Sequence, residues 1–410
     1  MPEIAKKALL VALALPAAMV LGPSSEATTY TMVYDGDLHE QAEVVARVEV
    51  LSTSPAPGLG APHTDHIVLV ERLLKGQVSG TTVVVRVLGG VGPDGLGLKV
   101  YGAPVLAPRD RALLFLRPRG DGTYGILHLM LGAFFEAGSG DGRVALRPFD
   151  GLRELGGSSS GEPEQVRDWD RFENWLADRS RGIFRDPDYL TAAVRTPGSL
   201  YLANLLEFEK QPIRFFEFDD GEKVTWKVGR GVSKARKSFR KAIRAWNGDS
   251  ATVVLLEQKG RTRNTSGFTA PDGINSIIFG DPNGEVAGTY SCFAGGVVAL
   301  GGAWFFSSPA LMQKIPKDKG KGKANVALEA DIVVNDGAEC LVSRNVKAAA
   351  QVFGHELGHT LGLGHSCDDV GSGPCRTESR AEALMRAFFH DDGRGAVLRS
   401  WDRKWLDELY

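Results

Sequence analysis

Short apolar runs with polar residues at alternate positions characterise the chain from residue 28 to residue 150. Such alternation sends successive side chains to opposite faces of a β-strand. The clearest runs are separated by Gly, Pro and Asp and cover residues 42–52, 66–76, 81–90 and 111–120. Short strands with turn residues between them build barrels and sandwiches. We therefore expect an all-β, barrel-like domain over residues 28–150.

Helical spacing replaces this pattern in the C-terminal half. Residues 236–247 place Phe239, Ile243 and Trp246 three and four positions apart among basic residues, which predicts an amphipathic helix. Residues 326–335 are rich in β-branched side chains and predict a strand. Helices and strands together place the chain in the α+β class.

A polar, Ser- and Gly-rich stretch at residues 158–165 indicates a joint between two domains. It is followed by one apolar stripe at helical spacing, made of Val166, Trp169, Phe172, Trp175 and Leu176. We expect a linker over residues 151–204 that contains a connecting helix docked on one domain. The second domain then covers residues 205–410.

The first 27 residues have the pattern of a secretory signal peptide. A lysine-containing start is followed by an apolar run of about 14 residues and then by small residues at Ser25 and Ala27. The run is shorter than the roughly 20 residues of a membrane span, so cleavage near Ala27 is favoured over an uncleaved anchor. No later segment is apolar enough to cross a membrane. We expect a secreted protein, extracellular or periplasmic.

Charge and cysteine content narrow the possible functions. The formal net charge is -2 with 24% charged residues, so we expect neither a nucleic-acid partner nor a general attraction to anionic membranes. Four cysteines suit two disulfides in an oxidising compartment. We pair Cys367 with Cys375 and Cys292 with Cys340, although four cysteines allow three connectivities and free buried thiols are the alternative.

The lysine-rich residues 314–323 are expected to form a solvated loop. The sequence does not specify the oligomeric state.

The segment HELGHTLGLGHS, residues 355–366, contains the spacing His-Glu-x-x-His-x-x-Gly-x-x-His. On a helix, His355 and His359 project from one face because they are four positions apart. Gly362 tolerates the unusual backbone that ends the helix and lets His365 approach from another side. Three histidine ligands with one open position are typical of catalytic zinc, and Glu356 is the candidate general base.

The long motif resembles that of the metzincin zinc peptidases, and within them the matrixins. Met385, in the phrase ALM, matches the methionine turn of that clan; an ordinary core methionine is the alternative. Ser366 after the third histidine, and Ala387 where other clan members have tyrosine, favour matrixins. The resemblance covers about residues 205–410. It implies a twisted mixed sheet, an active-site helix and a C-terminal helix in which Asp402 supports the methionine turn.

The resemblance also implies how a substrate would bind. The strand at residues 326–335 would form the rim of the cleft and pair with an extended peptide. Arg386, Phe388 and Phe389 would line the main specificity pocket, although the two phenylalanines also suit a core.

Departures from the matrixin pattern exclude two of its features. All four cysteines lie in the C-terminal half, so a cysteine switch is excluded. No histidine lies between His128 and His355, so we predict no second zinc.

Other candidate ligands have less support. Asp272, Asp281 and Asn283 could hold calcium, but these are ordinary turn residues and we favour turns. His63 and His66 lie in a Pro- and Gly-containing stretch and are expected at the surface. The phrases ERLLKG and GAPVLAPRDRALLFLRP resemble a domain of bacterial secreted proteins that precedes metalloproteases, and an OB-like barrel is expected there.

The sequence thus predicts a secreted zinc endopeptidase that acts on protein or peptide substrates. Its expected site consists of the three histidines with one zinc ion and Glu356 as base. The alternative from another class is a secreted binding protein that retains the fold but is catalytically silent or latent. A zinc hydrolase acting on a non-peptide amide is a third possibility.

Overall fold

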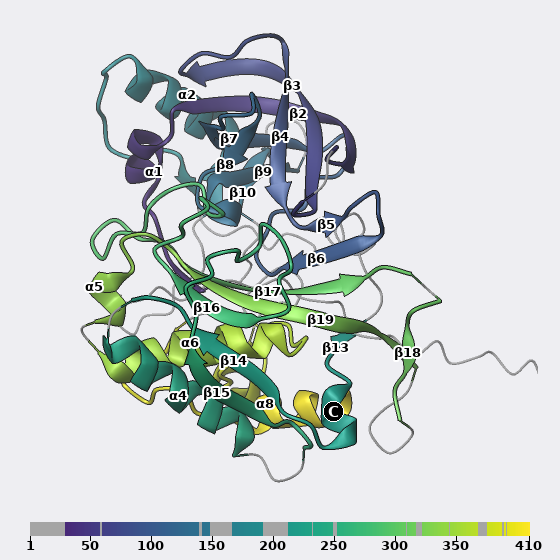
Figure 1. Ribbon diagram of the computed structural model, residues 1–410. Helices are drawn as coiled ribbons and strands as arrows, with labels where there is room; N and C mark the ends of the chain where they lie inside the picture. The colour runs from purple at the N-terminus through teal and green to yellow at the C-terminus, as the bar shows by residue number, and fades with distance from the viewer. Residues whose placement is uncertain are drawn as a thin grey trace, which may run out of the picture.

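Two groups of strands make up most of the structure, a barrel with a sheet extension and a mixed sheet covered by helices (Figure 1). The class is α+β, as expected. This computed structural model describes residues 29–57, 60–138, 142–147, 166–191, 212–231, 233–248, 252–308, 310–316, 322–343, 345–367, 375–387, 389–390 and 392–410. The expected signal peptide, the joint at residues 158–165 and Phe388 lie outside the described residues.

The N-terminal barrel has five strands in the order β7-β2-β3-β4-β8, and it closes because β8 also pairs with β7. The strands are β2 (Val44–Pro55), β3 (His63–Lys75), β4 (Thr82–Leu88), β7 (Arg111–Pro118) and β8 (Tyr124–Ile126). Only β4 and β8 pair in parallel within this barrel. Alternate side chains of β2, from Val44 to Val50, are buried in the barrel core, as the period of two predicts. The expected barrel is confirmed.

Beyond β7 the barrel continues as a short sheet of β9 (Ala133–Ala137), β10 (Val144–Leu146), β11 (Val166–Asp168) and β12 (Leu190–Thr191). The helices α1 (Asp35–Gln41) and α2 (Trp169–Ser180) and the 3-10 helix η1 (Leu129–Gly132) pack nearby. The connecting helix is confirmed as α2, but it begins one turn later than its apolar stripe. Val166 lies in β11, and the Asp168 carboxylate caps the helix by accepting from the amide of Arg171 at 2.9 Å.

The mixed sheet runs in the order β15-β14-β16-β19-β17-β6-β5. Its strands are β14 (Val224–Val228), β15 (Leu256–Arg261), β16 (Asn275–Phe279), β17 (Gly296–Phe306), β19 (Lys323–Val334), β6 (Leu96–Val100) and β5 (Gly90–Val91). Strands β15, β14, β16 and β19 are parallel, whereas β17 is antiparallel to β19. The short strands β1 (Thr29–Thr31), β13 (Ile213–Arg214) and β18 (Gln313–Lys314) join it at the sides.

Helices cover the face of the mixed sheet that lies away from the barrel (Figure 1). They are α4 (Ser233–Asn247), α5 (Glu339–Val342), α6 (Val346–Thr360), α7 (Glu378–Ala381) and α8 (Ser400–Leu409), with the 3-10 helix η3 (Glu217–Asp220). The amphipathic helix predicted at residues 236–247 is α4, and its apolar stripe of Phe239, Ile243 and Trp246 is buried against α6 and the sheet. The expected C-terminal helix is α8.

Three strands from the N-terminal part of the chain belong to the mixed sheet. The outer edge of β17 pairs antiparallel with β6 over residues Gly302 to Phe306 and with β1 over Gly296 to Ala299. The strand predicted at residues 326–335 was expected to form the rim of the cleft and to pair with a peptide, and this position is wrong. It is part of β19, which has β16 on one side and β17 on the other along residues Asp331 to Val334, so this stretch has no free edge for a peptide.

The predicted surface position of His66 is also wrong. His66 is buried in β3, and its Nδ1 lies 3.0 Å from the Thr53 hydroxyl, while His63 in the same strand is partly buried. The disulfides Cys292–Cys340 and Cys367–Cys375 are present, as predicted. None of the described helices is long and apolar enough to span a membrane.

Candidate metal centre

The helix that carries the motif has well-defined ends. At its start, the Asn345 side chain accepts from the amides of Lys347 (2.9 Å) and Ala348 (3.3 Å), a regular N-cap. At its end, Gly362 has φ +87° and its amide donates to the carbonyl of His359 at 2.8 Å. A Cβ at Gly362 would lie 2.2 Å from the carbonyl oxygen of Ile213, so only glycine fits this turn. The chain therefore reverses as predicted and returns to the helix.

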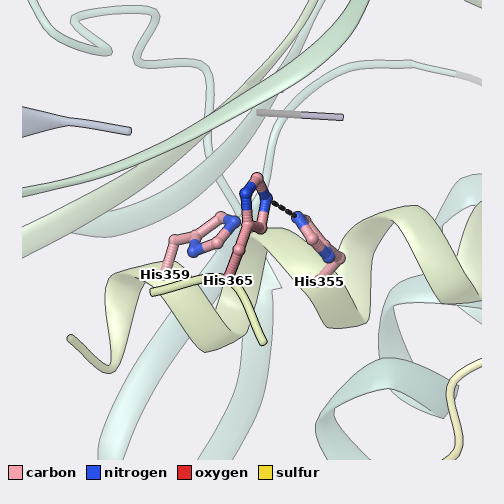
Figure 2. Close-up of side chains that lie close together, drawn as sticks. All are labelled: His355, His359 and His365. Atoms are coloured by element: carbon pink, nitrogen blue, oxygen red, sulfur yellow. Dashed lines mark hydrogen bonds between the residues drawn. The ribbon is translucent and has the colours of Figure 1, made fainter. Parts of the chain in front are cut away.

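This turn brings the third histidine to the first two. Figure 2 shows His355 and His359 rising from α6 with His365 between them. One ligand atom from each ring lies within 4.8 Å of the others, and all three side chains are buried. The Nε2 atoms of His355 and His365 are 3.1 Å apart, near the roughly 3.3 Å between two nitrogen ligands of tetrahedral zinc. Among the described residues, this is the one group of three or more His, Cys, Asp or Glu side chains that could hold a metal ion.

Hydrogen bonds on the far side of two rings determine which nitrogen faces the centre. His355 Nδ1 lies 2.9 Å from the carbonyl oxygen of Leu384, and His359 Nδ1 lies 2.8 Å from that of Leu363. A carbonyl can only accept, so each Nδ1 carries the proton and each Nε2 keeps its lone pair. The Nε2 of His359 is buried without a hydrogen-bond partner. A buried nitrogen lone pair without a hydrogen-bond donor, as on His359 Nε2, is what a metal ligand requires.

Burial keeps the imidazoles of His355 and His359 neutral. It lowers the pKa of His355 to about 3, with a further contribution from His365, and it holds the pKa of His359 well below its usual value. Metal ligands must be neutral imidazoles. The two side chains are therefore in the form that binds a cation at neutral pH.

Glu356 lies beside the histidines and is fully buried. Its Oε1 accepts hydrogen bonds from the amide of Thr29 (3.0 Å) and from the Thr29 hydroxyl, whereas Oε2 has no hydrogen-bond partner. Burial raises the pKa of Glu356 to about 8, and the Thr29 hydrogen bonds oppose that rise. The carboxyl group thus has the elevated proton affinity of a candidate acid or base.

Met385 packs against α6, and Asp402 holds the turn that contains Met385. Met385 is fully buried, and a Cβ on Gly358 of α6 would lie 2.1 Å from its sulfur. The Asp402 carboxylate accepts from the amides of Leu384 (2.8 Å) and Met385 (2.9 Å) and from that of Arg399 (2.7 Å). Because the carbonyl of Leu384 also accepts a hydrogen bond from Nδ1 of His355, Asp402 is linked to the histidine group through this turn.

Two residues at this centre were not predicted from the sequence. Tyr101, directly after β6, stacks on His359 with ring centroids 4.8 Å apart and an interplanar angle of 19°. Thr29 contacts Glu356 from the N-terminal strand β1. Neither residue belongs to a motif. One feature of the sequence could have indicated such contacts. The run that forms β17 is almost wholly apolar, and a buried apolar strand needs partner strands at both edges.

The remaining candidate residues lie outside the histidine group. Arg386 is buried, and Phe389 packs against the core as its alternative assignment suggested. The carboxylate of Asp281 accepts from the amides of Glu285 (2.8 Å) and Val286 (2.9 Å), and Asn283 donates to the carbonyls of Thr265 and Ser266. Such hydrogen bonds are those of turn residues, which was the favoured interpretation for this segment.

Comparisons with known proteins add no assignment. No protein-family model matches the chain. No curated protein matches it either. The functional argument therefore depends on the site itself and on the resemblance of its motif.

Proposed function

We propose that this protein is a secreted zinc-dependent endopeptidase with a metzincin-type, matrixin-like catalytic domain. The observation that carries the proposal is the convergence of three buried histidines around one point, with the carboxyl group of Glu356 beside them. The two disulfides are consistent with an oxidising, extracellular compartment. We further propose that the catalytic domain covers about residues 205–410 and that the barrel of residues 28–150 is OB-like.

Zinc is the metal that this ligand set suits best. His355, His359 and His365 would hold it, because three neutral imidazoles in a partly closed site are the usual ligands of catalytic zinc. When bound, Zn²⁺ acts as a Lewis acid that polarises a substrate carbonyl and acidifies water. The buried surroundings and the fixed Nδ1 hydrogen bonds of two ligands preorganise the site for that ion.

Glu356 would perform the proton transfers of peptide hydrolysis. Its carboxylate removes a proton as the water oxygen bonds to the carbonyl carbon, and it returns that proton to the amine as the carbon–nitrogen bond breaks. Met385 and Asp402 would keep the support beneath the ligands rigid.

One observation favours the alternative of a silent or latent protein with the same fold. One carboxylate oxygen of Glu356, Oε1, is already hydrogen-bonded to Thr29. All four motif residues are nonetheless intact, which favours an enzyme over a protein that has lost catalysis.

The proposed function is tested by zinc analysis and a cleavage assay on the full chain. The zinc-loaded protein should cleave casein or a mixed peptide library, and a chelator should abolish cleavage. Glu356→Gln should retain one zinc per chain but lose at least about a hundredfold in rate, because the base is removed. Glu408→Gln, on the exposed face of α8, is the matched control and should behave as the wild type. Near-normal turnover by Glu356→Gln would refute the assigned role.

A further inference from the structure

The outer edge of β17 runs past the metal centre, and two segments of the N-terminal part of the chain occupy it. Strand β6 pairs with Gly302 to Phe306, and β1 pairs with Gly296 to Ala299. Both are antiparallel to β17, so they point the same way and lie in line along its edge. Between them only Leu300 and Gly301 remain outside these two pairings.

The break between the two segments lies at the candidate site. The amide of Tyr101, the residue after β6, donates to the carbonyl of Gly301 at 3.3 Å. A Cβ on Gly301 would lie 2.7 Å from the carbonyl oxygen of Glu356, so β17 and α6 are in close contact at this position. Two segments of this chain therefore follow the path of one extended peptide, and their ends meet beside Glu356.

Both ends contact catalytic groups of the proposed enzyme. The Tyr101 ring covers one face of His359, and Tyr101 is almost fully buried. On the other side of the break, Thr29 donates from its amide and its hydroxyl to Oε1 of Glu356. Any substrate carbonyl placed between the histidines and Glu356 would have to displace these residues.

Packing holds the two segments in place. Leu98 and Val100 of β6, Tyr30 of β1, and Val297, Leu300 and Trp304 of β17 belong to one buried apolar cluster. Gly97 shows how closely β6 fits, since a Cβ at this position would lie 2.4 Å from the ring of Phe305. The contact is thus an extended, apolar and hydrogen-bonded interface rather than a loose approach of a terminus.

We propose that β1 and β6 with Tyr101 act as an intramolecular inhibitor that holds the enzyme latent by occupying the β17 edge and capping His359 and Glu356. This inference rests on the proposed function and deepens it by assigning a regulatory role to the N-terminal part of the chain. Cleavage requires release of these segments, and the fraction of molecules with a free edge determines apparent substrate affinity.

The experiment uses the full zinc-loaded chain and two independent variants. Gly97→Ala forces β6 away from Phe305, and Tyr101→Ala removes the ring from His359. Gly120→Ala is the matched control, because a Cβ there meets nothing within 4 Å. Hydrogen exchange of the β6 and β17 amides reports release of the edge, and binding of a fluorescent peptide hydroxamate reports access to the metal independently of turnover.

The expected result is that both variants bind the hydroxamate at least about tenfold more tightly than the wild type, in line with a larger open fraction. Exchange at Lys99 and Tyr101, whose amides face β17, should accelerate in Gly97→Ala, while Gly120→Ala should match the wild type in both measurements. Equal hydroxamate affinity in the wild type and in a variant with faster exchange would overturn the inference. A Tyr101→Ala protein with weaker hydroxamate binding than the wild type would also overturn it, because Tyr101 would then assist binding.

The two proposals fail in different ways. If the variants bind the hydroxamate more tightly yet cleave no peptide, occlusion stands and the assignment as a peptidase fails. If the wild type already cleaves as fast as both variants, the peptidase assignment stands and latency fails.

Discussion

Gly358 and Met385 are in such close contact that no side chain fits between them. A Cβ on Gly358 would lie 2.1 Å from the Met385 sulfur and 2.7 Å from the ring of Trp246. Gly358 is a variable position of the histidine motif, between Glu356 and His359, and the contact explains why this chain has glycine there. The methionine packs against the helical turn that carries His355 and His359.

Gly358→Ala should therefore destabilise the protein even though alanine favours helix. Replacing a helical glycine by alanine ordinarily gains roughly 1 kcal/mol, whereas forcing an extra methyl group into a filled core costs about 1–3 kcal/mol. We expect a net loss of unfolding free energy and a weaker affinity for zinc, measured by urea unfolding and by competition with a chelator. Gly354→Ala, in the same helix, is the comparison with the milder overlap, because its Cβ would lie 3.0 Å from its nearest neighbour instead of 2.1 Å, so it should destabilise the protein less than Gly358→Ala. A more stable Gly358→Ala protein would contradict the contact.

Asp402→Asn should loosen the turn that supports His355. The carboxylate accepts from three backbone amides, and an asparagine offers one oxygen acceptor and a donor that faces those same amides. We expect a loss of about 1–3 kcal/mol in unfolding free energy and a zinc affinity lower by about 10- to 100-fold, as for other outer-shell partners. Asp407→Asn is the control on the exposed face of α8. Unchanged zinc affinity in Asp402→Asn would show that the turn does not orient the ligand.

The sequence predicted those parts of the fold that depend on local patterns. The helix at residues 236–247 and the barrel strands follow from period and turn residues alone, and the histidine group follows from spacing on α6 with one glycine turn. The supporting contact of Asp402 with Met385 came from the family resemblance, not from periodicity.

The pairing of strands that are far apart along the chain could not be predicted from the sequence. Strand β1 pairs with β17 although more than 260 positions separate them along the chain, and no local feature specifies that register. The misplacement of residues 326–335 has the same origin, because a run of β-branched residues predicts a strand but not its neighbours. Tyr101 was missed because its partner His359 is fixed only by the pairing of β6.

Metal addition should stabilise the chelator-treated protein by an amount that grows with the logarithm of the free zinc concentration. Binding to the folded state alone contributes about 4 kcal/mol when free zinc exceeds its dissociation constant about 1,000-fold. We expect a clear rise in melting temperature by calorimetry, and His359→Gln should abolish it because one of three ligands is lost. His66→Gln removes a buried histidine away from the centre and should retain the rise. An equal rise in His359→Gln would place zinc elsewhere on the protein.

His128 should make the protein less stable in mild acid. Its ring is buried between Gly288 and Gly296, and a Cβ added to either glycine would lie 2.8 Å from the ring. The Nε2 atom of His128 lies 2.9 Å from Oε1 of Gln41. Burial, with a smaller contribution from the positive charge of Arg117, lowers the pKa of His128 to about 4.

Because the folded-state pKa of His128 lies below the unfolded value of about 6.5, its stabilising contribution is complete above pH 6.5. That contribution is lost as the pH falls through 4, and the loss attributable to this residue reaches about 2 kcal/mol at pH 5. His128→Asn is the suitable substitution, since His128 has φ +51° and asparagine tolerates left-handed backbone.

Urea unfolding at pH 7.5 and pH 5, in excess chelator, should show a difference in unfolding free energy smaller by about 2 kcal/mol in His128→Asn than in the wild type. Gln41→Ala removes the hydrogen bond but keeps the histidine, so it should retain the pH dependence of the wild type. An unchanged pH dependence in His128→Asn would mean that the acid sensitivity arises at other buried histidines, of which His39 and His66 also have pKa values lowered to about 4. Since His128 lies between the barrel and the first residue of β17, its protonation is expected to weaken the same interface that covers the histidine group.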